Sequence, residues 1–346
     1  MARSVLKIDL DALAANWRDL AAASGSAEAG AVVKADGYGL GATQVATRLA
    51  REGAKRFFVA IAEEGVEVRK AVGPDATIHV FGGHMAGDAA VLRDNGLIPM
   101  LNSGEQWQRH QSECPDLPFG IQLDSGMNRL GLEPEDWADI RDAVMAKGPE
   151  LVMSHLACAD EPDHAMNAQQ LEAFRDMTAG IDAPKSLSAT GGILMGRDFH
   201  FDVTRPGIGM YGGEPFTGAR PVAYLNIPVI QARTVGIGES VGYGNTLVAH
   251  KETRVATIAA GYADGIIRAQ SGKGQVFVGE TPCDILGRVS MDLIGIDISE
   301  LDHTPESVTF LGLRQTVDTV ATYAGTIGYE ILTSLGARYQ REYLGA

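Results

Sequence analysis

A lysine followed by three closely spaced glycines is the most chemically suggestive feature of this 346-residue sequence. Lys34 ends a short apolar run that begins at Ala31, and Gly37, Gly39 and Gly41 follow it. Apolar strand residues around the amine would disfavour its charged form and lower its pKa, and glycines let backbone approach a bound group closely. Such a lysine is suited to nucleophilic chemistry on a carbonyl compound. The alternative interpretation is a strand-end lysine that reaches solvent beside a flexible turn.

The longer segment resembles a known family. Lys34-Ala-Asp-Gly-Tyr38-Gly-Leu-Gly41 is similar to the segment that carries the pyridoxal-phosphate lysine in the alanine racemase family. The resemblance implies that Lys34 holds pyridoxal 5'-phosphate covalently and that Tyr38 contributes to its binding. Further matching segments run from near residue 7 to the C-terminus.

Arg205 lies in a second matching segment, Arg-x-Gly-Ile-x-Met-Tyr-Gly. An arginine at a strand end could form a surface salt bridge or contact a phosphate. The resemblance instead implies that Arg205 faces the pyridine nitrogen of the cofactor. A guanidinium is already protonated and can only donate a hydrogen bond, so it would not protonate that nitrogen and would limit side reactions such as transamination. His155, in Ser-His-Leu-Ala, resembles the family histidine that packs beside the ring and this arginine.

The run Gly207-Ile-Gly209-Met-Tyr-Gly212 also matches the glycine fingerprint of dinucleotide-binding folds. That fingerprint requires a helix to open inside it, whereas the residues that follow here are typical of a turn. A phosphate monoester is a better ligand, because the backbone N–H groups of Gly207 and Ile208 come after the last strand of the predicted barrel, where barrels commonly bind phosphate. Thr190, after the preceding strand, is expected to complete this cradle.

Arg129 is the expected anchor of a substrate carboxylate. It lies in Asp-Ser-Gly-Met-Asn-Arg-Leu-Gly, which resembles the family segment whose arginine binds the substrate carboxylate and the phenolic oxygen of the cofactor. The guanidinium of arginine can bind a carboxylate in bidentate fashion, through two parallel hydrogen bonds. Many family members have a carbamylated lysine seven residues earlier that orients this arginine. Gln122 stands there in this chain and brings no negative charge, although its oxygen can accept a hydrogen bond.

Tyr243 is the candidate for a second catalytic base. It lies in Ser-Val-Gly-Tyr-Gly-Asn-Thr, which resembles the family segment that bears this base, although a tyrosine between glycines is often an exposed turn residue. Racemisation requires a proton to leave one face of a planar carbanion and another to arrive on the opposite face, so Lys34 and Tyr243 would lie on opposite sides. The resemblance also assigns Tyr262 to the substrate entrance and Tyr329 to the phosphate and entry channel.

The resemblance further implies that the backbone N–H of Met291 meets the substrate carboxylate, in a loop where the family often has cysteine and this chain has Ser290. In that family these second-domain segments enter the active site of the partner subunit. A homodimer with shared active sites is therefore implied by resemblance alone.

A cluster of possible metal ligands needs a separate explanation. Its spacing fits no common zinc pattern, and a helix start accounts for the acidic residues more simply. We therefore predict no metal site there. The cluster consists of His155, Cys158, Asp160, Asp163 and His164.

Composition limits the partners and the compartment. A net charge of −15 argues against nucleic acid and anionic membranes, both of which repel an acidic protein. Three widely spaced cysteines do not suggest a disulfide framework, which is typical of a reducing cytoplasm. Charges at Lys7, Asp9 and Asp11 interrupt any signal-peptide core, and no apolar run is long enough to span a bilayer.

The order of predicted elements indicates an α/β fold with two domains. Eight short apolar runs alternate with helical patterns, as in a closed (β/α)₈ TIM-type barrel whose working groups lie at the carboxyl ends of the strands. We predict strands at 31–33, 57–61, 77–81, 98–101, 119–123, 151–153, 186–189 and 201–204. We predict helices at 43–52, 63–71, 105–111, 135–145 and 167–178.

From Pro221 onward, β-like runs separated by glycine-rich turns predict a mainly-β domain. We therefore divide the chain into a barrel at residues 1–220 and a β domain at residues 221–346. The runs lie at 229–235, 254–259, 275–278, 283–289 and 293–298, and the pattern from 316 to 344 is helical.

The resemblance implies a pyridoxal-phosphate-dependent racemase that interconverts L- and D-alanine and supplies D-alanine for cell-wall peptidoglycan, and the composition favours a cytoplasmic location. A racemase acting on serine or a broader set of amino acids is one alternative. A non-enzymatic barrel that carries the cofactor would need neither a second domain nor Tyr243. A decarboxylase of basic amino acids on the same plan should pair the ring nitrogen with a carboxylate, which Arg205 argues against.

Overall fold

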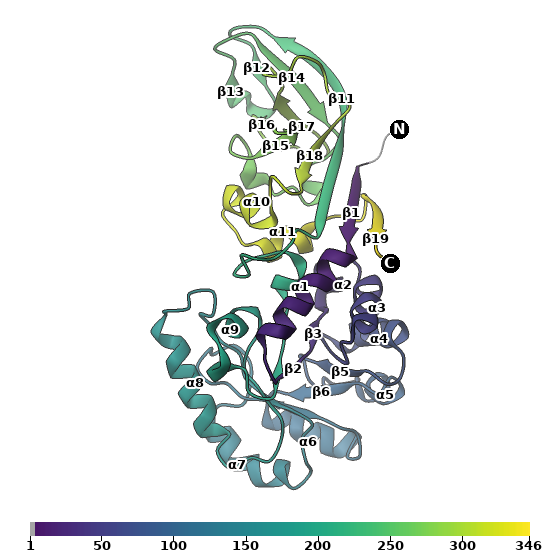
Figure 1. The fold of residues 1–346 in the computed structure, drawn as a ribbon, viewed down its shortest axis with the longest axis vertical. Helices are drawn as coiled ribbons and strands as arrows, with labels where there is room; N and C mark the ends of the chain where they lie inside the picture. Colours follow the sequence, from purple (N-terminus) through teal and green to yellow (C-terminus); the bar gives the residue numbers. More distant parts are fainter. Residues whose placement is uncertain (1–3) are drawn as a thin grey trace. The chain divides into compact units, whose positions relative to one another are not determined.

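The computed structural model describes residues 4–346, which form two compact units (Figure 1). The barrel unit comprises Ala14–Met210 and Pro215–Gly218. The sheet unit comprises the described residues up to Leu13, together with Tyr211–Glu214 and Ala219–Ala346. The chain therefore crosses between the units several times, whereas we predicted a single boundary after residue 220. Residues 1–3 of the predicted barrel domain lie outside the described residues.

The barrel unit is built on parallel strands that pair in chain order, as a (β/α)₈ barrel requires. Seven of them form one continuous sheet: β3 (Ala31–Val32), β4 (Arg56–Val59), β5 (Thr77–Val80), β6 (Ile98–Leu101), β7 (Gly120–Gln122), β8 (Val152–Met153) and β9 (Lys185–Ser186).

An eighth strand closes the barrel. β10 (Val203–Thr204) pairs with β2 (Glu28–Ala29), and β2 continues into β3 across Gly30. Gly30 N–H donates to the Thr204 carbonyl at 2.9 Å, and Ala189 forms a parallel bridge with Arg205 on the other side of β10. The predicted barrel is therefore confirmed.

Helices follow the strands and lie outside them in Figure 1. The five predicted helices are present with boundaries shifted by one or two residues. Besides the short segment α2 (Lys34–Tyr38), most of whose backbone is left-handed, three further helices, α1, α5 and α9, were not predicted. The set consists of α1 (Leu10–Ala23), α3 (Ala42–Glu52), α4 (Ala62–Val72), α5 (Ala89–Asp94), α6 (Gly104–Glu113), α7 (Pro134–Met145), α8 (Ala165–Met177) and α9 (Thr190–Met195).

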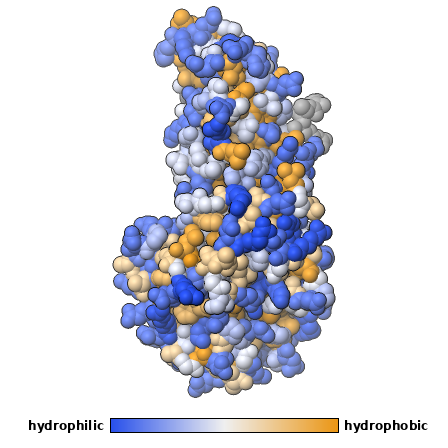
Figure 2. Space-filling model, in the orientation of Figure 1, coloured by the Kyte–Doolittle hydropathy of each residue, from blue (hydrophilic) through white to orange (hydrophobic). Residues whose placement is uncertain are grey.

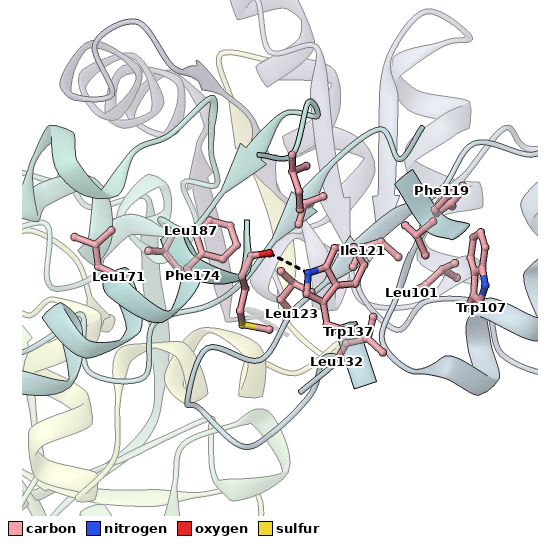
Figure 3. Close-up of a cluster of buried hydrophobic side chains, with 14 of the residues drawn as sticks. Leu101, Trp107, Phe119, Ile121, Leu123, Leu132, Trp137, Leu171, Phe174 and Leu187 are labelled. Carbon is pink, nitrogen blue, oxygen red and sulfur yellow. Dashed lines mark hydrogen bonds between the residues drawn. The ribbon is translucent and has the colours of Figure 1, made fainter. Parts of the chain in front are cut away.

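A large apolar cluster joins β6–β8, together with Leu187 directly after β9, to the helices α6–α8 (Figure 3). Phe174 is fully buried, and its ring meets Phe201 edge to face at 5.0 Å between centroids. Trp137 is also buried, and its indole N–H donates to the Met177 carbonyl at 2.9 Å. This packing fixes β7 and β8, the strands that precede Arg129 and His155.

The sheet unit contains an eight-stranded sheet in the order β14-β17-β16-β15-β18-β11-β1-β19, with an additional pairing of β14 to β11. That pairing closes six of the strands on themselves, with β1 and β19 as an extension. The strands are β1 (Val5–Asp9), β11 (Ala223–Val235), β14 (Thr253–Ile258), β15 (Gln275–Val278), β16 (Thr281–Leu286), β17 (Ile294–Asp297), β18 (Ser307–Leu311) and β19 (Gln340–Leu344). The predicted mainly-β region is therefore confirmed.

The helical prediction for the C-terminal segment is wrong at its end. Two short helices form, α10 (Val317–Ala324) and α11 (Gly328–Ser334), but Gln340–Leu344 is the strand β19. It pairs in parallel with β1, which on its other edge pairs antiparallel with β11. The N-terminal strand therefore supplies backbone partners that local periodicity does not reveal.

On the face drawn in Figure 2, hydrophilic residues predominate and hydrophobic ones lie scattered among them. Within residues 4–346, none of the helices has the length and apolar character needed to cross a membrane.

Candidate active site

Several predicted site residues of the barrel unit follow strands at the same end of the barrel. Lys34 comes two residues after β3, His155 two residues after β8, and Arg205 directly after β10. Thr190 begins α9, which follows β9. Because parallel strands end at one rim, these four side chains belong to the rim where barrel active sites are built.

Lys34 is half-buried, and its environment favours the neutral amine. Burial lowers the pKa of Lys34, and the positive charges of Arg129 and Arg205 lower it further, whereas the negative charge of Glu64 raises it. Its Nζ lies 5.7 Å from the centre of the Phe81 ring. The predicted lowering of this pKa is therefore confirmed in direction.

The backbone that follows Lys34 makes a left-handed turn. Ala35, Asp36, Gly37 and Tyr38 have φ values of 52°, 53°, 61° and 55°. Each non-glycine residue in this conformation costs about 1–2 kcal/mol, so the surrounding structure must hold the turn in place. Part of that support is internal, since Gly37 N–H donates to the Val33 carbonyl at 3.0 Å.

The expected phosphate-binding residues lie together. Tyr38 is 5% exposed, and a Cβ added at Gly207 would lie 2.7 Å from its Oη. The Oγ1 of Thr190 accepts hydrogen bonds from the N–H groups of Gly207, at 3.1 Å, and Gly209, at 3.3 Å. Ile208 begins the short helix η2 (Ile208–Tyr211) beside them. The cradle is shaped so that only glycine fits next to the tyrosine hydroxyl.

Arg205 is 2% exposed and is held by oxygen acceptors. Its guanidinium donates to Ser186 Oγ at 2.5 Å, to the Ser154 carbonyl at 2.6 Å and to the Leu187 carbonyl at 3.1 Å. A fourth, longer contact of 3.4 Å reaches Nδ1 of His155. Burial lowers the pKa of Arg205 to about 9, so the side chain is still protonated at neutral pH.

His155 is neutral beside this arginine. Burial, followed by the positive charges of Arg205, Arg129 and Lys34, lowers the pKa of His155 to about 3. Because a guanidinium can only donate, Nδ1 of His155 must be the acceptor in their contact, and the ring proton belongs on Nε2. The histidine therefore presents an N–H donor on its other edge.

Arg129 is exposed on a loop that is held by its backbone. The Asp124 carboxylate accepts two backbone N–H groups of this loop at 2.8 Å each. Gln122 is buried, and its Nε2 donates to the Leu130 carbonyl at 3.1 Å. Gln122 thus braces the backbone immediately after Arg129.

In the sheet unit, two of the predicted substrate-facing segments are joined directly. Tyr262 N–H donates to the Ser290 carbonyl at 3.0 Å, and Ala263 N–H donates to the Met291 carbonyl at 3.0 Å. A Cβ at Gly261 would lie 2.3 Å from both of these carbonyl oxygens, so the pairing requires glycine there. The side chains of Tyr262 and Met291 are 43% and 53% exposed.

The other two predicted tyrosines also lie in the sheet unit, whereas Lys34 lies in the barrel unit. Tyr243, in the short helix η3 (Tyr243–Asn245), is 71% exposed. Tyr329 lies in the first turn of α11.

Two residues that support the site were missed by the sequence reasoning. Arg338 binds Asp264 through two nitrogens, at 2.7 and 2.8 Å, and Asp292 at 2.7 Å, which joins the loops that carry Tyr262 and Met291. Glu64 binds the backbone N–H of Ala35 at 2.8 Å. The sequence signal for Glu64 was only that of an ordinary acidic residue in the first turn of a helix.

One residue of the possible metal cluster considered in the sequence, His164, has a structural role. His164 precedes α8, and its Nδ1 accepts the N–H of Met166 at 3.1 Å. Among residues 4–346, no group of three or more His, Cys, Asp or Glu side chains is arranged to hold a metal ion.

Comparison with known proteins gives full-length matches. The family model "Alanine racemase, N-terminal domain" matches residues 8–215, and "Alanine racemase, C-terminal domain" matches residues 222–343. The chain is 59% identical over 344 residues to an alanine racemase of Cereibacter sphaeroides, covering 99% of both chains. It is 42% identical over 372 residues to that of Rhizobium meliloti, covering 99% of this chain and 97% of the relative.

Solved structures agree with these matches. The alanine racemase from Bartonella henselae with covalently bound pyridoxal phosphate superimposes with a TM-score of 0.95 at 35% identity, covering 99% of this chain and 100% of the other. The biosynthetic alanine racemase from Pseudomonas aeruginosa gives a TM-score of 0.92 at 36% identity with the same coverage.

Proposed function

The chain belongs to the alanine racemase family, and from that premise we propose how its own residues interconvert L-alanine and D-alanine with pyridoxal 5'-phosphate. The observation that carries the proposal is the convergence of Lys34, His155 and Arg205 at one barrel rim in a chain that matches its relatives over its full length. The product D-alanine would serve peptidoglycan synthesis.

The residues present fit the cofactor. Thr190, Gly207 and Ile208 would hold the phosphate together with Tyr38, whose hydroxyl lies where a Cβ at Gly207 would collide. Arg205 would donate a hydrogen bond to the pyridine nitrogen, because at neutral pH its guanidinium has no unprotonated nitrogen to accept one. Neutral His155 would pack beside the ring. When bound, pyridoxal 5'-phosphate supplies an electron sink that acidifies the α-hydrogen of the amino acid attached to it.

Lys34 and Tyr243 are the proposed acid/base pair. Burial and the charges of Arg129 and Arg205 favour the neutral amine of Lys34, the form that bonds to a carbonyl carbon and accepts a proton. Lys34 would take the α-proton of the D isomer, and the phenol of Tyr243 would serve the L isomer from the opposite face. Arg129 and the backbone N–H of Met291 would bind the substrate carboxylate, with Tyr262 and Tyr329 at the entrance.

The test of function is a chiral assay. Purified protein supplied with pyridoxal 5'-phosphate and L-alanine should approach equal amounts of both enantiomers, because enantiomers have equal free energies. Lys34→Ala should lose this activity together with the visible absorbance of the bound cofactor, whereas Lys70→Ala, at an exposed helical position, should retain both. An unchanged spectrum in Lys34→Ala would refute the assignment of Lys34. The same assay run with L-serine and other amino acids measures the substrate range.

We also propose that the enzyme is a homodimer in which Tyr243 enters the partner's site. Support comes from the family resemblance and from the 71% exposure of Tyr243. Mixing Lys34→Ala with Tyr243→Phe would then rebuild one intact site in every heterodimer. Random reassortment makes about half the dimers hetero, so the mixture should recover roughly a quarter of wild-type activity if sites act independently. An inactive mixture with verified heterodimers would refute the shared site.

A cytoplasmic location is part of the proposal. All three cysteines are free thiols, which is typical of proteins kept in a reducing compartment. Cell fractionation followed by the racemase assay would test the location, and activity found outside the cytoplasmic fraction would contradict it.

A further inference from the structure

Glu64 connects the left-handed turn that follows Lys34 to the end of the neighbouring strand β4. Its Oε1 accepts the backbone N–H of Ala35 at 2.8 Å, and its Oε2 accepts the backbone N–H of Ala60 at 2.8 Å. Ala35 directly follows Lys34, and Ala60 directly follows β4. One carboxylate in the first turn of α4 therefore binds backbone at the ends of two adjacent strands, β3 and β4.

The position of this contact is where the backbone needs external support. Ala35 begins the left-handed turn, a conformation that is unfavourable for a residue with a Cβ. Ala35 is also exposed, so its N–H would otherwise exchange freely with water. A hydrogen bond to a carboxylate is stronger than one between neutral groups, and it fixes the plane of the Lys34–Ala35 peptide bond. That plane sets the direction in which the Lys34 side chain leaves the backbone.

We propose that Glu64 is a positioning residue that holds the left-handed turn after Lys34 and so aims the reactive amine, an inference that rests on the proposed role of Lys34. Its second effect is electrostatic. The charged and titratable groups that act on Lys34 or on which Lys34 acts are Glu64, Arg129, Arg205 and His155. Glu64 raises the pKa of Lys34 against the two arginines, and His155 is neutral.

The first experiment uses the unmodified holoenzyme. Amide hydrogen exchange should show the Ala35 N–H protected by about ten- to a hundred-fold relative to an unbonded amide, although the residue is exposed. An unprotected Ala35 amide would overturn the proposal. This measurement requires no variant and remains decisive even if substitutions at Glu64 prevent folding.

The second experiment compares Glu64→Gln with Glu63→Gln, its exposed neighbour on the same turn. Glutamine keeps one acceptor oxygen and presents N–H groups to the other backbone donor, so one of the two contacts is lost. In the full-length chain freed of cofactor by hydroxylamine, the pH midpoint for acylation of Lys34 should move to lower pH in Glu64→Gln only. An unchanged midpoint would overturn the proposal.

Steady-state kinetics then separate positioning from a merely structural role. With cofactor restored, Glu64→Gln should lose about a hundred-fold in kcat, because a misdirected reactive group costs on that order, while KM for alanine changes by less than about twofold. An unchanged kcat would overturn the proposal. The hydrogen-exchange and acylation measurements need no racemase activity. Failure to racemise alanine would therefore refute the proposed function, while these two measurements would still test the role of Glu64.

Discussion

Replacing Arg205 with methionine should abolish racemisation while leaving the cofactor-free chain nearly as stable as the wild type. Methionine is flexible and close in length to the apolar stem of arginine, so packing around the stem is largely kept. The substitution removes a buried positive charge. It also removes the donors that bind the carbonyls of Ser154 and Leu187, Ser186 Oγ and, at a longer distance, His155 Nδ1. These two changes act on the free energy of unfolding in opposite directions.

The structure gives the size of each change. Burial lowers the pKa of Arg205 to about 9, well below the ordinary value of an arginine, which corresponds to about 5 kcal/mol against the charged form at 1.36 kcal/mol per pH unit. Removing the charge recovers that cost. Ser186 Oγ still donates to the Val203 carbonyl at 2.6 Å. The carbonyls of Ser154 and Leu187 are left without this donor, at about 1–3 kcal/mol each, or about 2–6 kcal/mol together. We therefore expect a net change of less than about 3 kcal/mol.

Arg205→Lys separates charge from hydrogen bonding. Lysine keeps a positive charge in the same buried site but has fewer hydrogen-bond donors, so this variant should be less stable than Arg205→Met at pH 7. Its folded-state pKa would lie below its unfolded value, so its stability should rise with pH as the amine loses its proton.

Thermal unfolding of the three cofactor-free, full-length proteins, followed by circular dichroism, is the assay. Arg205→Met should unfold within about 10 °C of the wild type, given about 2–4 °C per kcal/mol for a unit of this size. A lysine variant more stable than the methionine variant would refute the desolvation argument. Retained racemisation in Arg205→Met would refute the role of the guanidinium.

Three further predictions test other parts of the structure. Burial holds the pKa of four histidines below the ordinary value of 6.5. The unfolded chain therefore binds more protons in acid, and the unfolding temperature should fall as the pH drops below about 6.5. An unfolding temperature that stays constant between pH 7.5 and 5 would contradict this. Gly131 has a φ of 123°, and a Cβ there would lie 2.7 Å from the Leu123 carbonyl carbon. Gly131→Ala should therefore distort the Arg129 loop and raise KM for alanine, whereas Gly148→Ala, with open space around its Cβ, should not. Equal KM values in the two variants would refute the loop argument. Gln122 cannot form a carbamate, so activity should not respond to bicarbonate, and a bicarbonate-dependent rise would show that a lysine elsewhere has taken that role. The four histidines are His79, His84, His110 and His155.

The barrel could be predicted because each strand is a short apolar run that ends in turn-forming residues, and the order of runs and helical patterns fixes the fold class. The helix α9 could not, since it begins Thr190-Gly-Gly and glycine is a poor helix former. Its glycines are required by packing instead. A Cβ at Gly191 would lie 2.6 Å from the Ala159 carbonyl oxygen, and one at Gly192 would lie 2.6 Å from Ser188 Oγ. Ala159 is distant in sequence from Gly191, so the local sequence does not predict the helix.

The strand β19 was missed for a related reason. Gln340–Leu344 gains its backbone partners from Val5–Asp9, at the opposite end of the chain. Both segments are short, and neither alone distinguishes a strand from the continuation of a helix. The boundary between the units follows from the same pairing, since β1 joins the sheet unit through β11 and β19.

The candidate site shows the same division between local and distant causes. Lys34, Arg205 and Tyr243 could be proposed from the sequence because the chemistry assigned to them resides in their own side chains and in the short segments that carry them. Glu64 acts through the backbone N–H of Ala35, and Gln122 acts through the Leu130 carbonyl, so the residue type of the partner carries no information. An acidic residue in the first turn of α4 is equally well explained by the helix dipole. Only the geometry shows that its carboxylate turns away from the helix to hold the peptide bond next to the reactive lysine. A role of this kind is therefore accessible from coordinates and not from residue patterns.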